Sequence, residues 1–205
     1  MQADPRSKNK TFSMDSVRTY LQEYAATAVK TLDAIPGETL EKTVDLLEAA
    51  YRAGKRIYVC GNGGSAAISD HLCCDWTKGT WVPGQPALKT HSLVANGALM
   101  TALANDYGYE ETFSTQVEMF GEKGDVLVAI SSSGNSPNIV KAVKAAQEKG
   151  MKVVGLSGFS GGKLKEMADF SMHANFDNYG LVEDCHQMIM HVLSQYLVRR
   201  LDKKA

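Results

Sequence analysis

The stretch DVLVAISSSGNSPNIVKAV, residues 125–143, decides the fold class of this chain. It opens with a short run of aliphatic residues, passes through a loop of serine, glycine and asparagine, and closes with apolar residues at helical spacing. The stretch RIYVCGNGGSAA, residues 56–67, repeats this order of strand, polar loop and helix, and KVVGLSG, residues 152–158, begins a third unit. Strands that are apolar throughout and alternate with helices predict an α/β fold, with a parallel sheet covered by helices on both faces.

Two helices are expected ahead of this α/β unit. Apolar residues recur at helical spacing over residues 14–35 and again over residues 38–53, and Pro36 and Gly37 interrupt the pattern between them. Together they predict a helical hairpin, residues 13–54, that packs on the α/β core.

The rest of the chain predicts one continuous domain. Residues 87–94 and 170–175 are typical of further strands, and residues 180–201 predict a long closing helix. Residues 1–12 are polar and are expected to be frayed. Since no linker or low-complexity segment interrupts the remainder, we expect residues 13–205 to form a single domain.

The composition is that of a globular protein with no bias toward nucleic acid or membranes. Hydrophobic residues make up 44% of the chain, and the 22 basic and 23 acidic residues leave a net charge of -1. These values exclude a disordered or collagen-like chain and argue against a general nucleic-acid binder. No apolar run is long enough to span a membrane, and residues 1–10 lack the apolar core of a signal peptide. We therefore expect a cytoplasmic protein whose four cysteines are reduced.

Two polar loops are expected at the carboxyl ends of strands, where parallel sheets bind ligands. Gly61–Ser65 and Ser131–Ser136 each combine flexible backbone with hydroxyl groups and open a helix, which together favour an anion. Either loop alone is also explained as a polar turn with capping residues. The pair predicts a phosphate ester held by neutral donors, because neither loop contains lysine or arginine. Nucleotide binding is not indicated, since the P-loop ending is missing and Ala66 stands where the dinucleotide fingerprint needs glycine.

Titratable side chains gather on two of the expected helices. His71 and Asp75 lie four residues apart and so share one helix face, and the closing helix carries Glu183, His186 and His191. Taken singly, each is explained as an exposed carboxylate or a hydrogen-bonded histidine. Beside two phosphate-type loops, the set predicts an active site with acid–base or metal chemistry.

Three segments resemble those of a known family. CGNGGSAA (60–67) and SSSGNSPNIVKAVKAAQEKGMKVVGLSG (131–158) resemble the two signature regions of SIS (sugar isomerase) domain proteins. ALANDYGYEETFSTQVE (102–118) is similar to the sedoheptulose 7-phosphate isomerases, also called phosphoheptose isomerases. The resemblance covers nearly the whole chain and implies a nested αβα sandwich around a central parallel sheet, assembled as a homotetramer.

The resemblance also implies a reaction and a substrate site. The reaction converts the ketose sedoheptulose 7-phosphate to the aldose D-glycero-D-manno-heptose 7-phosphate, a precursor of bacterial surface heptose, through an enediol. The substrate-binding positions that it implies are Asn62, Gly63, Ser65, Asn96, Ser131, Ser132, Ser133, Ser136 and Glu183.

Asp75 and His191 stand at the positions of the family's catalytic acid–base groups. The family has Glu where Asp75 stands, one methylene longer, and a displacement of ~1 Å can cost on the order of a hundredfold in rate. The resemblance further implies Zn²⁺ bound by His71, Asp75, Glu183 and His191, with Glu183 replacing a Gln. Glu183 and His191 lie roughly 12 Å apart along a straight helix, too far to share one ion. Either Glu183 precedes the helix, or one of the two is not a ligand, or, as we expect, the site lies between subunits.

Other positions depart from the family pattern. Gly79, Asn96 and Gly180 stand where the family usually has an arginine and two acidic residues. The sugar end of the site is therefore remodelled while the phosphate loops are intact, which predicts a phosphosugar more firmly than sedoheptulose itself. Two alternatives remain: a non-catalytic SIS protein that binds a phosphosugar or a replication initiator, and a sugar-phosphate sensor. The retained acid–base set favours the enzyme, and no basic helix-turn-helix precedes the first strand.

Overall fold

A sheet of five parallel strands forms the centre of the computed structural model, which describes residues 9–202. The strand order is β2-β1-β3-β4-β5, and every neighbouring pair is parallel. The strands are β1 (Arg56–Gly61), β2 (Lys89–Ser92), β3 (Val126–Ser131), β4 (Lys152–Gly158) and β5 (Phe170–Ala174). All five coincide with segments that the sequence predicted as strands, three of them from apolar runs, and the predicted α/β class is confirmed.

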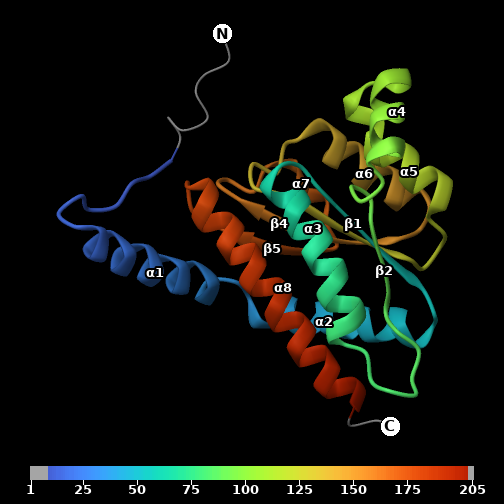
Figure 1. Ribbon diagram of the computed structural model, residues 1–205, viewed down its shortest axis with the longest axis horizontal. Coiled ribbons are helices and arrows are strands. Elements are labelled where there is room, and N and C mark those ends of the chain that lie inside the picture. Colours follow the sequence, from blue (N-terminus) through green and yellow to red (C-terminus); the bar gives the residue numbers. More distant parts are fainter. Residues whose placement is uncertain (1–8, 203–205) are drawn as a thin grey trace.

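Helices cover both faces of the sheet (Figure 1). Alternate residues of each central strand enter opposite cores: Ile57 of β1 packs in one and Tyr58 in the other. The first face carries α2 (Gly37–Arg52), α3 (Gly64–Cys74) and α8 (Tyr179–Asp202), and the second carries α5 (Thr112–Phe120), α6 (Pro137–Glu148) and α7 (Gly162–Met167). The chain therefore forms the αβα sandwich that the resemblance implied.

The order of strands reverses between β1 and β3. From β1 the chain moves outward to β2, which forms the edge of the sheet, and then returns to β3 on the other side of β1. In open parallel sheets such a reversal leaves a crevice at the carboxyl ends of the two central strands. The register pairs Gly61 at the end of β1 with Ile130 near the end of β3, so the two polar loops leave the sheet side by side.

The two helices ahead of the first strand are present, but they do not form the predicted hairpin. Figure 1 shows α1 (Val17–Asp33) extending away from α2 instead of folding back along it. Each of them packs on α8, and Ala28 and Leu32 of α1 lie in a small core with Leu181 of α8. Helical periodicity located both helices, whereas their mutual angle depends on α8, which lies at the other end of the sequence.

The prediction of a frayed N-terminus is wrong for residues 9–12; its other part, residues 1–8, lies outside the described residues. The backbone N–H of Lys10 donates a hydrogen bond of 2.6 Å to the loop ahead of α8. The ring of Phe12 stacks on that of Phe176, with a centroid distance of 5.9 Å. One aromatic anchor in an otherwise polar segment is enough to fix this stretch against the domain.

The segment between β2 and β3 contains helices that the sequence pattern did not indicate. They are α4 (Gly97–Tyr107), a short 3₁₀ turn (Tyr109–Glu111) and α5. Asn96 caps α4, because its Oδ1 accepts the backbone N–H of Leu99 at 3.0 Å. Neither these helices nor any other within residues 9–202 is long and apolar enough to cross a membrane.

Candidate active site

A small serine-lined pocket opens at the crevice between β1 and β3. Its volume is about 160 Å³, and its lining contains no lysine or arginine. The lining residues are Asn62, Ser65, Ile130, Ser131, Ser132, Ser133, Ser136, Tyr179 and Glu183. Seven of the nine predicted substrate-binding residues are thus in this list, and Gly63 lies between two of its members.

Glycines shape the two loops so that helices can start at the pocket. Gly63, which precedes α3, has φ 56° and ψ -120°, a conformation that is open essentially only to glycine. Gly134 also has a positive φ of 66°, and a side chain there would collide with the carbonyl of Gly161. As a result the N-termini of α3 and α6, with their positive potential, both face the crevice.

The hydroxyl groups of the pocket are mostly buried and only loosely tied to the protein. Oγ of Ser131 donates to Oγ of Ser136 at 3.3 Å, which is a long hydrogen bond. Oγ of Ser132 is buried and has no hydrogen-bond partner within residues 9–202. An unpartnered buried hydroxyl costs free energy unless a ligand supplies the missing bond, so this arrangement favours a ligand rich in oxygen.

Two asparagines that were expected to bind substrate have structural partners. The amide of Asn62 exchanges hydrogen bonds of 2.9 Å with that of Asn138, and its Oδ1 also accepts the hydroxyl of Tyr109 at 2.8 Å. These bonds hold the first loop against α6 and shape the pocket wall. Asn96 caps α4 through the bond described above and is absent from the pocket lining.

Glu183 brings a carboxyl group into the serine pocket. It lies on the first turns of α8, and its carboxyl packs so closely on Gly64 that a side chain at Gly64 would collide with it. Burial raises the pKa of the Glu183 carboxyl, and the charge of Asp184 raises it further. The alternative that Glu183 precedes the closing helix is wrong, because α8 begins at Tyr179.

His71, Asp75 and His191 meet at a second cluster, between α3 and α8. Nε2 of His71 lies 3.5 Å from Oδ1 of Asp75, and Nε2 of His191 lies 3.3 Å from Oδ2 of the same carboxylate. The imidazole rings are 5.1 Å apart at 74°. The side chains are 48%, 30% and 37% exposed, respectively, so the cluster is open to a substrate. One carboxylate between two imidazoles is an arrangement suited to proton transfer.

Local structure explains why Asp75 reaches His191. The chain leaves α3 in a π-helical turn, Asp75–Gly79, and such turns re-aim side chains and are frequent at functional sites. Trp76, in this turn, is buried, and its indole N–H donates to the carbonyl of Met190 at 3.1 Å. Because Trp76 follows Asp75 and Met190 precedes His191, this bond holds the two site residues in register.

Two further side chains of α8 lie near the cluster and have different roles. The amide Nε2 of Gln187 is 2.6 Å from Nδ1 of His71, a contact that the sequence analysis missed although Gln187 lies one helical turn before His191. His186 is fully buried and hydrogen-bonded through Nε2 to the carbonyl of Ser157 at 3.1 Å. Burial lowers the pKa of His186 to about 4, so it is a neutral core residue away from the chemistry.

The second cluster has the donor set of a catalytic metal site. Within the described residues, His71, Asp75 and His191 form a group whose ligand atoms all lie within 4.8 Å of one another. Two imidazoles and one carboxylate are ligands that Zn²⁺ accepts, and three protein ligands leave a position for substrate or water. Glu183, the fourth expected ligand, does not join them and faces the serine pocket instead.

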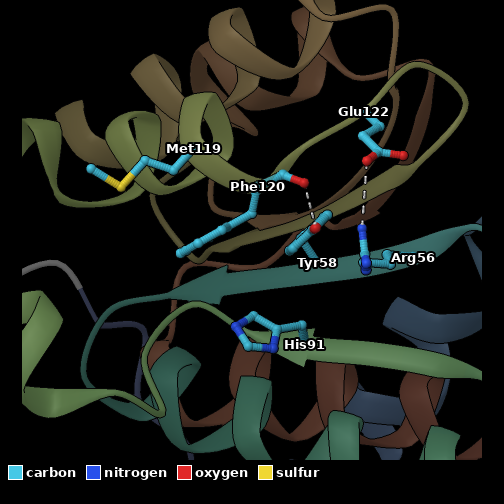
Figure 2. A pocket seen from close by; sticks show the side chains of 6 residues that line it. All are labelled: Arg56, Tyr58, His91, Met119, Phe120 and Glu122. Atoms are coloured by element: carbon cyan, nitrogen blue, oxygen red, sulfur yellow. Dashed lines mark hydrogen bonds and ion pairs between the residues drawn. The ribbon is translucent and has the colours of Figure 1, made fainter.

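A separate pocket lies at the opposite end of β1 (Figure 2). Its volume is about 370 Å³, and Arg56, Tyr58, His91, Met119, Phe120 and Glu122 line it. Figure 2 shows that its polar groups face one another: the hydroxyl of Tyr58 donates to the carbonyl of Phe120 at 2.7 Å, and Arg56 and Glu122 form an ion pair at 3.9 Å. It lacks the serine hydroxyls and the helix N-termini of the crevice, and none of the predicted site residues is in its lining.

Comparison with known proteins agrees with the fold. The family model of the SIS domain matches residues 19–158. The phosphoheptose isomerase of Rhodospirillum rubrum is 37% identical over 179 residues, which is 87% of this chain and 94% of that protein. The solved phosphoheptose isomerase of Francisella tularensis superposes with a TM-score of 0.84 at 29% identity, over 91% of this chain and 98% of that one. That of Neisseria gonorrhoeae gives 0.80 at 30% identity, over 89% and 98%.

Proposed function

The chain belongs to the SIS domain family and, within it, to the phosphoheptose isomerases, and we propose that it isomerises sedoheptulose 7-phosphate to D-glycero-D-manno-heptose 7-phosphate. One observation supports this most: the imidazoles of His71 and His191 converge on the carboxylate of Asp75, although α8 follows α3 only much later in the chain. A protein that only bound a phosphosugar would need the serine pocket but not this cluster.

In this proposal the serine pocket binds the phosphate. The hydroxyls of Ser65, Ser131, Ser132, Ser133 and Ser136 and the N-termini of α3 and α6 supply neutral donors. With no cation in the lining, the phosphate is held without an ion pair, which suits a group that must leave after every turnover. Glu183 borders the same pocket and is placed to contact the sugar hydroxyls that follow the phosphate.

The chemistry moves two protons and changes no other atom. Asp75 takes a proton from C1 of the ketose, which gives an enediol, and returns a proton to C2. His191, paired with Asp75 at 3.3 Å, donates a proton to the C2 oxygen and removes one from the C1 hydroxyl. One bond to hydrogen breaks and one forms at carbon, and likewise at oxygen, so ketose and aldose have the same composition.

The second cluster fits Zn²⁺ by its donor set, as its imidazole and carboxylate atoms all lie within 4.8 Å. His71, Asp75 and His191 would hold the ion, which when bound supplies a Lewis acid for the sugar oxygens. Zn²⁺ is therefore part of the proposal, with three ligands from one chain and without Glu183.

The proposal includes a homo-oligomer, the tetramer that the resemblance implies. Ser65 and Asp75 lie about 15 Å apart along one helix, whereas the seven bonds from C2 of the sugar to phosphorus span about 8 Å. Side chains project sideways from a helix, so one chain's phosphate pocket and its own Asp75 are poorly placed to hold one substrate. Met188 (46% exposed) and Val192 (59% exposed) flank His191 with apolar surface that a second copy would cover.

Subunit complementation tests this arrangement. His191→Gln inactivates one half of the site, and Ser65→Leu blocks the other. If the two halves come from different copies, co-expression of the two inactive variants restores a fraction of the activity. If both halves belong to one chain, mixed oligomers stay inactive, and light scattering then shows whether an oligomer forms at all.

The isomerase activity itself is tested with a panel of substrates. Purified protein is incubated with sedoheptulose 7-phosphate and with related ketose phosphates, with and without added Zn²⁺, and aldose formation is followed. Metal content is measured on the same preparation. Turnover of the seven-carbon ketose, lost after chelation and restored by Zn²⁺, supports the whole proposal; turnover that chelation leaves unchanged supports the isomerase but excludes zinc; no turnover of any ketose phosphate contradicts it.

A further inference from the structure

We propose that Gln187 is a positioning residue that selects which nitrogen of His71 faces the catalytic cluster. It deepens the proposed function, since His71 belongs to the site described above. The amide of Gln187 lies 2.6 Å from Nδ1 of His71, while the other ring nitrogen, Nε2, lies 3.5 Å from Asp75. Both nitrogens of one imidazole are therefore engaged, one by α8 and one by the cluster.

The α3 side and α8 meet through two pairs of side chains. His71 and Asp75 are four residues apart on the α3 side, and Gln187 and His191 are four residues apart on α8, so each pair lies on one helix face. Gln187 opposes His71, and His191 opposes Asp75. The side chain of His71 is 48% exposed, and the contact with Gln187 is the one that engages its Nδ1 and so adds to the hold that Asp75 has on Nε2.

The chemistry of an amide explains why a glutamine suits this place. With its NH₂ toward Nδ1, the amide donates a hydrogen bond, the ring proton is on Nε2, and His71 donates toward Asp75. With the amide turned by half a revolution, its oxygen accepts a proton from Nδ1 and leaves the Nε2 lone pair free for a cation. Glutamine can form the hydrogen bond to Nδ1 in both states. A glutamate could form it only in the second state, and an apolar side chain could form it in neither.

The test compares Gln187→Met and Gln187→Glu with the wild type. Gln147→Met is the matched control, because the amide of Gln147 also makes a hydrogen bond, to the carbonyl of Met167 at 2.8 Å, but lies on α6 away from the cluster. The first readout is the tautomer of His71 in the metal-free protein, by ¹⁵N NMR at a pH where the ring is neutral. His71→Asn identifies the signal among those of the five histidines.

We expect the Nε2–H tautomer in the wild type and in the control, a mixture of tautomers in Gln187→Met, and the Nδ1–H tautomer in Gln187→Glu. The second readout is the dissociation constant for Zn²⁺ by calorimetry. Loss of a residue that orients a histidine ligand weakens metal binding about 10- to 100-fold, which is the result expected for Gln187→Met. Gln187→Glu and Gln147→Met should stay within about threefold of the wild type.

A wild-type tautomer in Gln187→Met would overturn the proposal, even if the variant were less stable. Equal changes in Gln187→Met and Gln147→Met would also overturn it, because they would reflect general destabilisation. Neither readout uses a sugar. A protein that fails to turn over sedoheptulose 7-phosphate would thus contradict the proposed function, while the role of Gln187 would still be decided by the tautomer.

Discussion

Nε2 of His191 lies 3.3 Å from Oδ2 of Asp75, although the two residues come from helices at opposite ends of the chain's α/β unit. The hydrogen bond from Trp76 to the carbonyl of Met190, 3.1 Å long, joins the residues next to them in sequence. The acid–base pair is therefore set by the packing of α8 on the π-helical turn after α3.

Lengthening the carboxylate at position 75 should impair the enzyme. The π-helical turn places Asp75 between two imidazoles, at 3.5 and 3.3 Å, so an extra methylene would move the carboxylate past them. Since a displacement of ~1 Å can cost about a hundredfold, we expect Asp75→Glu to lower kcat/KM roughly ten- to a hundredfold. Steady-state kinetics on variants with matched thermal stability measure this. If Asp75→Glu were as fast as the wild type, the π-helical turn would not be what fits this site to aspartate in place of the family's glutamate.

Removing the hydroxyl of Ser132 should weaken substrate binding and leave the fold intact. The buried Oγ has no partner in the described part of the chain, so Ser132→Ala removes no internal hydrogen bond. We expect Tm to stay within a degree or two, and KM to rise about tenfold for the loss of one hydrogen bond to phosphate. Ser171→Ala is the control, since its Oγ is also buried without a partner but lies on β5, outside the pocket. Equal KM values in both variants would remove Ser132 from the phosphate site.

Neutralising Glu183 should help phosphate bind. Burial and the neighbouring Asp184 raise the pKa of the carboxyl, so its ionised form is disfavoured in the folded state. A raised carboxyl pKa means that stability is lost as pH rises through the titration of Glu183. Glu183→Gln should therefore raise the free energy of unfolding at pH 7. It should also lower KM two- to tenfold, because a glutamine can still hydrogen-bond to the sugar hydroxyls and places no negative charge beside the phosphate. A higher KM in the variant would contradict this and would show that sugar binding needs the negative charge of the carboxylate.

Acid should destabilise the fold through His186. Burial lowers the pKa of His186 from 6.5 to about 4. Between these two pH values His186 is therefore protonated in the unfolded chain and neutral in the folded one. The contribution of neutral His186 to the free energy of unfolding is fully present above pH 6.5. It is lost as pH falls toward 4, and the total loss is about 3 kcal/mol. Denaturant unfolding at pH 7 and pH 5 measures the loss. In His186→Gln most of this pH dependence should vanish, and a slope that persists in full would assign it to other groups.

Much of the fold could be predicted from local sequence. Apolar runs located the three central strands, and the glycine- and serine-rich loops located the crevice, because burial and turn formation depend on residues that are close in sequence. The two edge strands were also predicted, although β2 is polar. The angle between α1 and α2 could not be predicted, since both helices pack on α8, which follows much later in the chain. The helices between β2 and β3 were missed because that segment, rich in alanine, tyrosine and acidic residues, offers weak periodicity.

The site was predicted in its parts and less well in its assembly. His71 and Asp75 share a helix face, as their spacing indicated, and His191 joins them. Glu183 lies eight residues before His191 on the same continuous helix, and that distance separates it from the cluster, one of the alternatives that the spacing left open. Gln187 was overlooked, because only packing of α8 against α3 shows which face of the helix meets His71.

The most direct test of the central claim is proton NMR of sedoheptulose 7-phosphate incubated with the wild type, with His191→Gln and with His91→Gln. His91 lies on β2 and lines the separate pocket shown in Figure 2, away from the catalytic cluster. His91→Gln therefore controls for the loss of an exposed histidine. The wild type and His91→Gln should both form the aldose, and His191→Gln should be slower by about 10² to 10⁴, the usual contribution of an acid–base group. Absence of aldose from the wild type, or equal rates for the two histidine variants, would contradict the account.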